Sequence, residues 1–167
     1  MKVDLINTSS DPDLLNEGCG AEYVHKEQSV PRGFHADHRS MKCITFDGDA
    51  DRQIYFYETA DGDLKILDGD KQFVFIMRYI IGLLKELGIE DEVPTVYAHS
   101  PYTNLKAIQY YEKEGIKGQV VRTGVKNAHP VIVQYPIGAN DEPNGHGTVA
   151  YKEQKLESIL KEKGLSD

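Results

Sequence analysis

The pattern of apolar positions predicts strands and helices that alternate along the chain. Short runs of β-branched and aromatic residues bounded by Gly, Pro, Asn or Asp are typical of strands. Apolar residues at intervals of three and four are typical of helices. Strands are expected at residues 2–6, 42–46, 53–57, 64–67, 95–99, 119–122, 131–135 and, more weakly, 148–151. Helices are expected at residues 20–26, 70–87, 103–114 and 156–163. This alternation favours an α/β fold, with mixed sheets flanked by helices.

Two local signals support this interpretation. The segment 70–87 repeats apolar residues at helical spacing, and Gly88 follows at the position where helices commonly end. Asp61-Gly62-Asp63 lies between two expected strands and is a hairpin signal. The strand expected at 2–6 has no preceding helix to cover it, as if the chain began inside a domain.

Composition excludes some classes of partner. The chain has 167 residues and a formal net charge of −8 at pH 7, so it lacks the basic surface that binds nucleic-acid phosphates. No apolar run approaches the roughly 20 residues that span a membrane, and the N-terminus lacks the apolar core of a signal peptide. Cys19 and Cys43 make no disulfide framework and are expected as free thiols in a reducing compartment. We therefore expect a cytoplasmic protein that binds neither nucleic acid nor membrane.

The strongest chemical signal is the acidic segment FDGDADR, at the end of the strand expected at 42–46. Alternate side chains of an extended segment share one face, so Asp47, Asp49 and Asp51 can point the same way. A bend at Gly48 can draw their carboxylates together. Converging carboxylates repel one another unless a cation lies among them. Hard oxygen ligands suit Mg²⁺ or Ca²⁺. The simpler alternative to a metal site is a solvated acidic turn.

Two other metal-binding folds use similar spacing. An EF-hand loop also has acidic residues at positions 1, 3 and 5, and Glu58 falls at position 12. However, Arg52 replaces the Gly that the loop needs at position 6, and strands rather than helices are expected on both sides. A Mg²⁺-dependent phosphatase of the haloacid-dehalogenase type would use Asp47 as nucleophile and Asp49 as acid. That family usually has Thr or Val where Asp51 stands.

The segments FDGDADR, QIYFY and LDGDK together resemble the metal loop of the α-D-phosphohexomutases. The resemblance is closest to the phosphoacetylglucosamine mutase branch, and it extends from LINTSS and NEGCGAEYV through nearly the whole chain. It implies that Asp47, Asp49 and Asp51 hold Mg²⁺. It also implies that Arg52 lies beside the phosphoryl group of a phosphoserine.

A second matching motif is EPNGHGT. The family grips sugar hydroxyls with an E-x-[NS]-G-H loop, and Asn at the third position is similar to the N-acetylglucosamine branch. The resemblance assigns substrate binding to Glu142, Asn144, Gly145 and His146. A carboxylate can accept bonds from adjacent hydroxyls, and an amide can both donate and accept. Pro143 departs from the small residue usual there, and taken alone the segment could be a Gly-rich hairpin.

A third match is TGVK. The family carries T-G-x-K before one or more histidines, and its Lys reaches the substrate region. The resemblance implies that Thr123 and Gly124 border the substrate and that Lys126 contributes a catalytic positive charge. An exposed turn lysine is an equally ordinary interpretation of Lys126. His129 follows, but a lone histidine is a weak signal.

Other candidates have less support. Ser100 lies beside His99 and Pro101, but it follows an expected strand where relatives have a non-catalytic turn, so it is expected to cap the next helix. His35 and His38 could be combined with either cysteine as zinc ligands, although the spacing fits no zinc signature well.

The resemblance also predicts the domain organisation. Residues 1–67 correspond to the C-terminal part of the metal-loop domain, domain 2, and residues 68–167 to the sugar-loop domain, domain 3. The family's phosphoserine loop and R-x-S-G-T-E-P phosphate clamp are not found in these residues. The implied function is part of an enzyme that interconverts N-acetylglucosamine 6-phosphate and 1-phosphate, with Mg²⁺ as cofactor and the missing domains as partners. The alternatives are a non-catalytic module that binds a cation or sugar phosphate, and the phosphatase.

Overall fold

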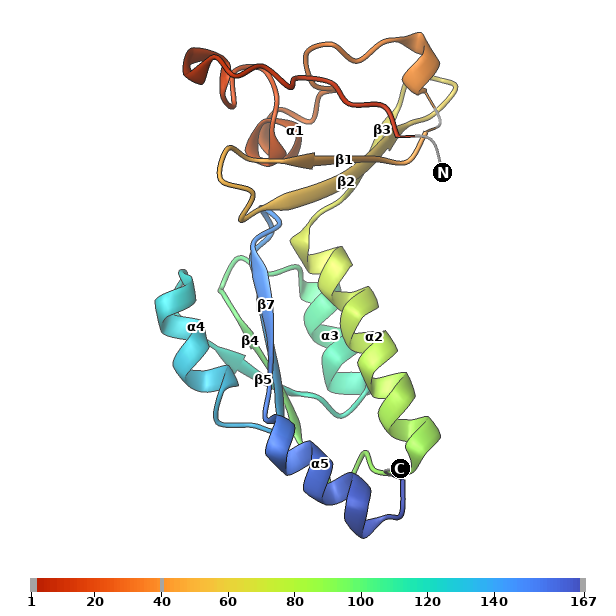
Figure 1. Ribbon diagram of the computed structural model, residues 1–167, viewed down its shortest axis with the longest axis vertical. Coiled ribbons are helices and arrows are strands. Elements are labelled where there is room, and N and C mark those ends of the chain that lie inside the picture. The colour runs from red at the N-terminus through yellow and green to blue at the C-terminus, as the bar shows by residue number, and fades with distance from the viewer. Residues whose placement is uncertain (1–2, 40, 166–167) are drawn as a thin grey trace. The chain divides into compact units, whose positions relative to one another are not determined.

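The computed structural model describes residues 3–39 and 41–165. The chain divides into two compact units (Figure 1). Unit 1 comprises Met1–Gly69 together with Asn144–His146, and unit 2 comprises Asp70–Pro143 and Gly147–Asp167. Among the described helices, none is both long and apolar enough to cross a membrane.

Unit 1 is built on a three-stranded antiparallel sheet in the order β1-β2-β3. The strands are β1 (Cys43–Phe46), β2 (Gln53–Glu58) and β3 (Leu64–Leu67), and the helical segments are η1 (Pro12–Leu14), α1 (Ala21–Glu27) and η2 (Ala36–His38). Along β2, Ile54 and Phe56 are buried while the intervening tyrosines are exposed, as the two-residue period of a strand requires. Ala21 and Val24, one turn apart on α1, complete this core.

Unit 2 contains a four-stranded mixed sheet in the order β5-β4-β6-β7, in which only β7 is antiparallel to its neighbour. Its strands are β4 (Thr95–His99), β5 (Lys117–Val120), β6 (Ile137–Asp141) and β7 (Gly147–Tyr151). The helices are α2 (Gly69–Leu87), α3 (Leu105–Lys113), α4 (Val125–Ile132) and α5 (Glu153–Glu162). The prediction of an α/β fold with mixed sheets and flanking helices is confirmed.

The sheet of unit 2 is covered on both faces, so β4 is buried along its whole length. Tyr97 packs with apolar residues of α2, α3 and α5 on one face. Val96 and Ala98 pack against Ala128 and Ile132 of α4 on the other face. Figure 1 shows α4 on one side of the strands and α2 with α3 on the other.

Two predictions about individual elements are wrong, and a third strand is displaced. Residues 3–6 form no strand, because they have no ladder partner in the described chain; Lys2, the first residue of that prediction, lies outside the described residues. The apolar run at 131–135 is the end of helix α4, since Ile132 shares a buried helical face with Ala128, and the strand starts only at Ile137, after Pro136. The strand expected at 119–122 is β5, displaced to Lys117–Val120.

Candidate functional site

The acidic segment forms the tight connection between β1 and β2 in unit 1. The backbone N–H of Arg52 donates to Asp47 Oδ1 at 3.1 Å, and the N–H of Ala50 donates to the Asp47 carbonyl oxygen at 3.1 Å. Ala50 has φ 59°, an uncommon conformation for a residue with a Cβ. This loop places carboxylate oxygens of Asp47, Asp49 and Asp51 within 4.8 Å of one another. The structure therefore brings together the three residues that the sequence singles out as metal ligands.

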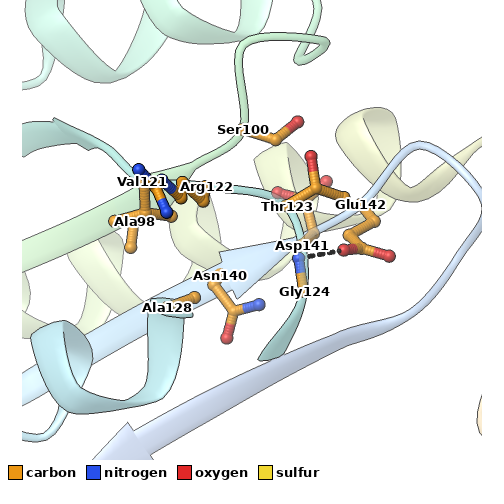
Figure 2. A pocket seen from close by; sticks show the side chains of 10 residues that line it. All are labelled: Ala98, Ser100, Val121, Arg122, Thr123, Gly124, Ala128, Asn140, Asp141 and Glu142. Carbon is orange, nitrogen blue, oxygen red and sulfur yellow. Dashed lines mark hydrogen bonds between the residues drawn. The ribbon is translucent and has the colours of Figure 1, made fainter. Parts of the chain in front are cut away.

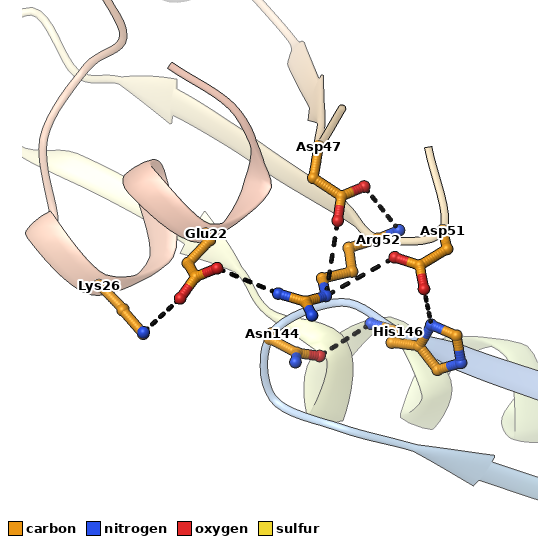
Figure 3. A network of polar contacts seen from close by, with 7 residues as sticks. All are labelled: Glu22, Lys26, Asp47, Asp51, Arg52, Asn144 and His146. Carbon is orange, nitrogen blue, oxygen red and sulfur yellow. Dashed lines mark hydrogen bonds and ion pairs between the residues drawn. The ribbon is translucent and has the colours of Figure 1, made fainter. Parts of the chain in front are cut away.

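Arg52 lies at the centre of the charges around this loop (Figure 3). Its Nε lies 3.5 Å from Asp47 Oδ2 and 3.6 Å from Asp51 Oδ1. Its terminal nitrogen Nη1 lies 3.1 Å from Glu22 Oε2 on helix α1. Glu22 also pairs with Lys26 one turn along the helix, and this hydrogen bond, with the two positive charges, lowers the pKa of Glu22. Sequence reasoning missed Glu22 and Lys26, because nothing in their local pattern indicates a distant partner.

The segment Asn144–His146 belongs to the same compact unit as the acidic loop, although it lies far along the sequence. His146 Nδ1 lies 3.2 Å from Asp51 Oδ2, and His146 forms an isolated β-bridge with Arg52. The N–H of Gln53 donates to the carbonyl oxygen of Gly145 at 3.2 Å. Asn144 Oδ1 accepts a bond from the His146 N–H at 3.1 Å, which closes the turn (Figure 3). Part of the predicted sugar loop is thus fixed beside the predicted metal loop.

The contact between this segment and Gln53 of β2 requires glycine at position 145. Its φ is +92°, and a Cβ at this position would lie 2.1 Å from the Gln53 carbonyl oxygen. Real Cβ atoms do not come so close to backbone oxygen. Only glycine therefore permits the observed packing of this segment against β2.

The other predicted substrate residues lie in unit 2, near the ends of β5 and β6. Glu142 Oε1 accepts a hydrogen bond from the Gly124 N–H at 3.0 Å (Figure 2). Gly124 and Thr123 precede helix α4, and Lys126 is exposed in its first turn. The structure therefore groups these four residues in unit 2, and it groups Asn144, Gly145 and His146 with the acidic loop in unit 1.

A small cavity of about 10 Å³ lies beside Thr123, Gly124 and Glu142, which is room for about one water molecule. Asn140 lines this cavity and is almost fully buried (Figure 2). Among the described atoms its Oδ1 has no hydrogen-bond partner. A buried polar atom of this kind commonly binds an ordered water, and sequence reasoning did not select Asn140.

The residue before Glu142 is a buried acid. Asp141 Oδ1 accepts a bond from the hydroxyl of Tyr97, and Tyr111 lies against Tyr97 with ring centroids 3.9 Å apart. Burial, and next the charge of Asp141, raise the pKa of Tyr97 far above its usual value. The same two causes raise the pKa of Tyr111. The hydrogen bond between Tyr97 and Asp141 fixes the end of β6, next to Glu142. No pattern in the sequence indicated this bond.

The weaker candidates have structural roles. Ser100 is buried and its hydroxyl accepts a bond from the Tyr102 N–H at 3.2 Å. The expectation that Ser100 caps α3 is wrong, because Asn104 is the cap and accepts from the Lys106 N–H. His38 lies 3.2 Å from Asp4 Oδ2. Within residues 3–39 and 41–165, the only group of three metal-type ligands is the aspartate cluster, which contains neither a histidine nor a cysteine.

Comparisons with known proteins identify the family. The family model described as phosphoacetylglucosamine mutase AMG1, domain III, matches residues 68–166, and the model of domain II matches residues 1–54. The chain belongs to the phosphoacetylglucosamine mutase family. It is 36% identical to the phosphoacetylglucosamine mutase of Arabidopsis thaliana over 99% of the chain, and 37% identical to that of Homo sapiens over 90% of it.

Solved structures of this family have the same fold. The Aspergillus fumigatus N-acetylphosphoglucosamine mutase in complex with GlcNAc-6P and magnesium matches 89% of the chain, with a TM-score of 0.82 and 32% identity. An N-acetylglucosamine-phosphate mutase of the α-D-phosphohexomutase superfamily, in its substrate complex, matches 90% with a TM-score of 0.80. The resemblance to α-D-phosphohexomutases is confirmed. The chain spans 31% of the length of the Arabidopsis relative and 30% of the Aspergillus chain.

Proposed function

We propose that this chain supplies the metal loop and the sugar loop of a mutase that interconverts N-acetylglucosamine 6-phosphate and N-acetylglucosamine 1-phosphate. The observation that carries the proposal is the convergence of Asp47, Asp49 and Asp51 beside Arg52, in a member of this family. We also propose that the protein is cytoplasmic, that residues 1–67 are the C-terminal part of domain 2, and that residues 68–167 are domain 3.

The donor set fits Mg²⁺. Three carboxylates offer hard oxygen atoms, and Mg²⁺ commonly takes only a few protein carboxylates and keeps other positions for water or phosphate. The span of 4.8 Å between the oxygens is compatible with ligands on one small ion. When bound, Mg²⁺ would neutralise charge on a phosphoryl group during transfer. Asp47, Asp49 and Asp51 are the residues that would hold it.

The remaining residues position the substrate. Arg52 is a fixed positive charge beside the carboxylates, and its planar guanidinium can bind phosphoryl oxygens in pairs. Glu142 and Asn144 can bind sugar hydroxyls, and Lys126 adds a mobile positive charge. Because Gly124 donates to one oxygen of Glu142, that carboxylate is held in a defined orientation. Such positioning is the main contribution that a protein makes to phosphoryl transfer.

Calorimetric titration with Mg²⁺ tests the metal loop. We expect weak binding by the wild-type chain, because three carboxylates fill only part of the coordination sphere, and loss of the heat in Asp49→Asn. The matched control is Asp61→Asn, which removes the same charge from an exposed turn of unit 1. Equal heats from wild type and Asp49→Asn would remove the metal-loop assignment, while loss of heat in Asp61→Asn would point to a general charge effect.

An activity assay tests how the catalytic parts are distributed. Hydrogen bonds to sugar hydroxyls replace bonds to water and contribute only about 0.5–1.5 kcal/mol each, and the family's phosphoserine loop and phosphate clamp are not in this sequence. We therefore expect no mutase turnover by these residues alone with N-acetylglucosamine 6-phosphate and a bisphosphate primer. Turnover would reveal a nucleophile within the chain, and Ser100→Ala would be the first variant to assay.

A further inference from the structure

The start of helix α1 is fixed close to the acidic loop. Ala21 and Val24 are fully buried and pack against β2. Gly20, which precedes the helix, has φ +93°, and a Cβ there would lie 3.4 Å from the carbonyl oxygen of Phe46, the last residue of β1. The helix cannot leave this position without exposing its apolar side chains to water. The backbone of Glu22 is therefore held near the loop that follows β1.

Glu22 makes the closest contact with Arg52 among the three carboxylates that the described chain places around this guanidinium (Figure 3). Arg52 Nη1 donates a hydrogen bond to Glu22 Oε2 at 3.1 Å. Arg52 Nε lies 3.5 Å from Asp47 Oδ2 and 3.6 Å from Asp51 Oδ1. Both of these distances exceed the roughly 2.7–3.2 Å of an ordinary N–H···O hydrogen bond. The guanidinium is thus bonded to Glu22 and only near the two aspartates.

The position of this guanidinium decides whether the loop carboxylates are available to a cation. An arginine can form two parallel hydrogen bonds to one carboxylate. A guanidinium released from Glu22 would therefore pair fully with Asp47 or Asp51, which are the nearest other acceptors of charge. Such a pair would occupy oxygens that a metal ion needs. A guanidinium held by Glu22 leaves those oxygens accessible.

We infer that Glu22 is a positioning residue, which holds the Arg52 guanidinium back from the acidic loop and so keeps its carboxylates open to Mg²⁺. This role rests on the metal loop of the proposed function. Glu22 acts through Arg52, since its own oxygens are not part of the converging aspartate group. Lys26 pairs with the other oxygen of Glu22, Oε1, so the carboxylate is held from both sides (Figure 3).

A two-dimensional ¹H–¹⁵N NMR titration of the full chain with MgCl₂ tests the inference, because the shift of the Gly48 amide reports cation binding in the loop even when it is weak. Glu22→Gln keeps the shape of the side chain and removes its charge. It should weaken Mg²⁺ binding by about threefold, the scale of an exposed ion pair. The control is Glu27→Gln, which removes the same charge from the exposed end of the same helix and should change binding by less than about 1.5-fold, since salt screens distant charges.

A double-mutant cycle separates positioning from a general effect of charge. In the Arg52→Gln background there is no guanidinium to hold back, so Glu22→Gln should change Mg²⁺ binding no more than Glu27→Gln does. The same loss of affinity with and without Arg52 would overturn the inference. So would unchanged affinity in Glu22→Gln when Arg52 is present and Asp49→Asn has abolished binding, a result that would leave the metal loop itself intact.

The Nε–Hε signal of Arg52 gives a second measurement that needs no metal ion. The signal is assigned by its absence from the spectrum of Arg52→Gln. In Glu22→Gln it should move downfield, because Nε then forms a stronger hydrogen bond to an aspartate of the loop, and in Glu27→Gln it should stay in place. An unmoved signal in Glu22→Gln would overturn the inference. A wild type without any Mg²⁺-dependent shift would instead refute the metal loop, and the Nε–Hε signal would still show whether Glu22 positions Arg52.

Discussion

The close packing of Gly145 against β2 predicts that Gly145→Ala destabilises this contact. In Gly145→Ala, the new Cβ would lie 2.1 Å from the carbonyl oxygen of Gln53 and 2.8 Å from its carbonyl carbon. These are backbone atoms, so no side-chain rotation relieves the contact. The segment Asn144–His146 must therefore move away from β2.

Two costs add in this variant. A side chain at positive φ costs roughly 1–2 kcal/mol, and φ is +92° at Gly145. Displacement also breaks the hydrogen bond from the Gln53 N–H to Gly145, which is worth about 0.5–1.5 kcal/mol. We expect a total loss of about 1.5–3.5 kcal/mol from the free energy that holds this segment in place.

Gly62→Ala is a matched control, because Gly62 has φ +89° in the same unit but a Cβ added there would have nothing within 4 Å. It should lose only the backbone term, about 1–2 kcal/mol. Amide hydrogen exchange measures the difference directly. The Gln53 N–H should exchange at least tenfold faster in Gly145→Ala, since it loses its acceptor, and should change much less in Gly62→Ala, which keeps that acceptor. Equal exchange of Gln53 in both variants would refute the steric reasoning.

Three other predictions concern Tyr97, Ala50 and Asp47. Tyr97→Phe should lower the free energy of unfolding by about 1–3 kcal/mol at neutral pH, because Asp141 loses a donor. Since the folded pKa of Tyr97 is raised, the stability that its hydroxyl provides is present below its unfolded pKa of about 10 and is lost progressively as the pH rises from there toward the folded pKa. Urea titrations should therefore show the stabilities of the two proteins converging at alkaline pH, and a constant difference would contradict this. Ala50→Gly should raise stability by up to about 1 kcal/mol, because glycine relieves positive φ, with unchanged Mg²⁺ heats. The chain with Mg²⁺ should not hydrolyse p-nitrophenyl phosphate, and turnover that disappears in Asp47→Asn would favour the phosphatase.

The sequence was most informative where a local pattern determines local structure. The apolar period of the segment 70–87 predicted α2 closely, because helical periodicity reports burial on one side. The alternation of apolar residues in β2 did the same for a strand. The run at 131–135 was misread because its β-branched residues favour strands locally, whereas packing of Ile132 under the sheet keeps it in a helix.

The candidate site was predictable only in part. The alternate spacing of Asp47, Asp49 and Asp51 showed that their carboxylates could converge, and they do. The pairs that join this loop to Glu22 and His146 span long stretches of sequence. No periodicity or composition encodes such contacts, because they depend on how distant elements pack. Burial of a carboxylate such as Asp141 was likewise invisible, since acids are usually exposed.

The sugar-loop motif shows why residues that adjoin in sequence need separate tests. Glu142 is bonded to Gly124 in unit 2, whereas His146, only a few residues later, is paired with Asp51 in unit 1. Replacing Glu142 should therefore alter how a sugar is held without disturbing the carboxylates of the acidic loop. Replacing His146 should alter the charge balance at Asp51 directly. In a full-length mutase, Glu142→Ala should lose turnover but keep Mg²⁺ binding, which would show that Glu142 acts on the sugar. A change in Mg²⁺ binding in His146→Ala would show that His146 acts on the metal loop.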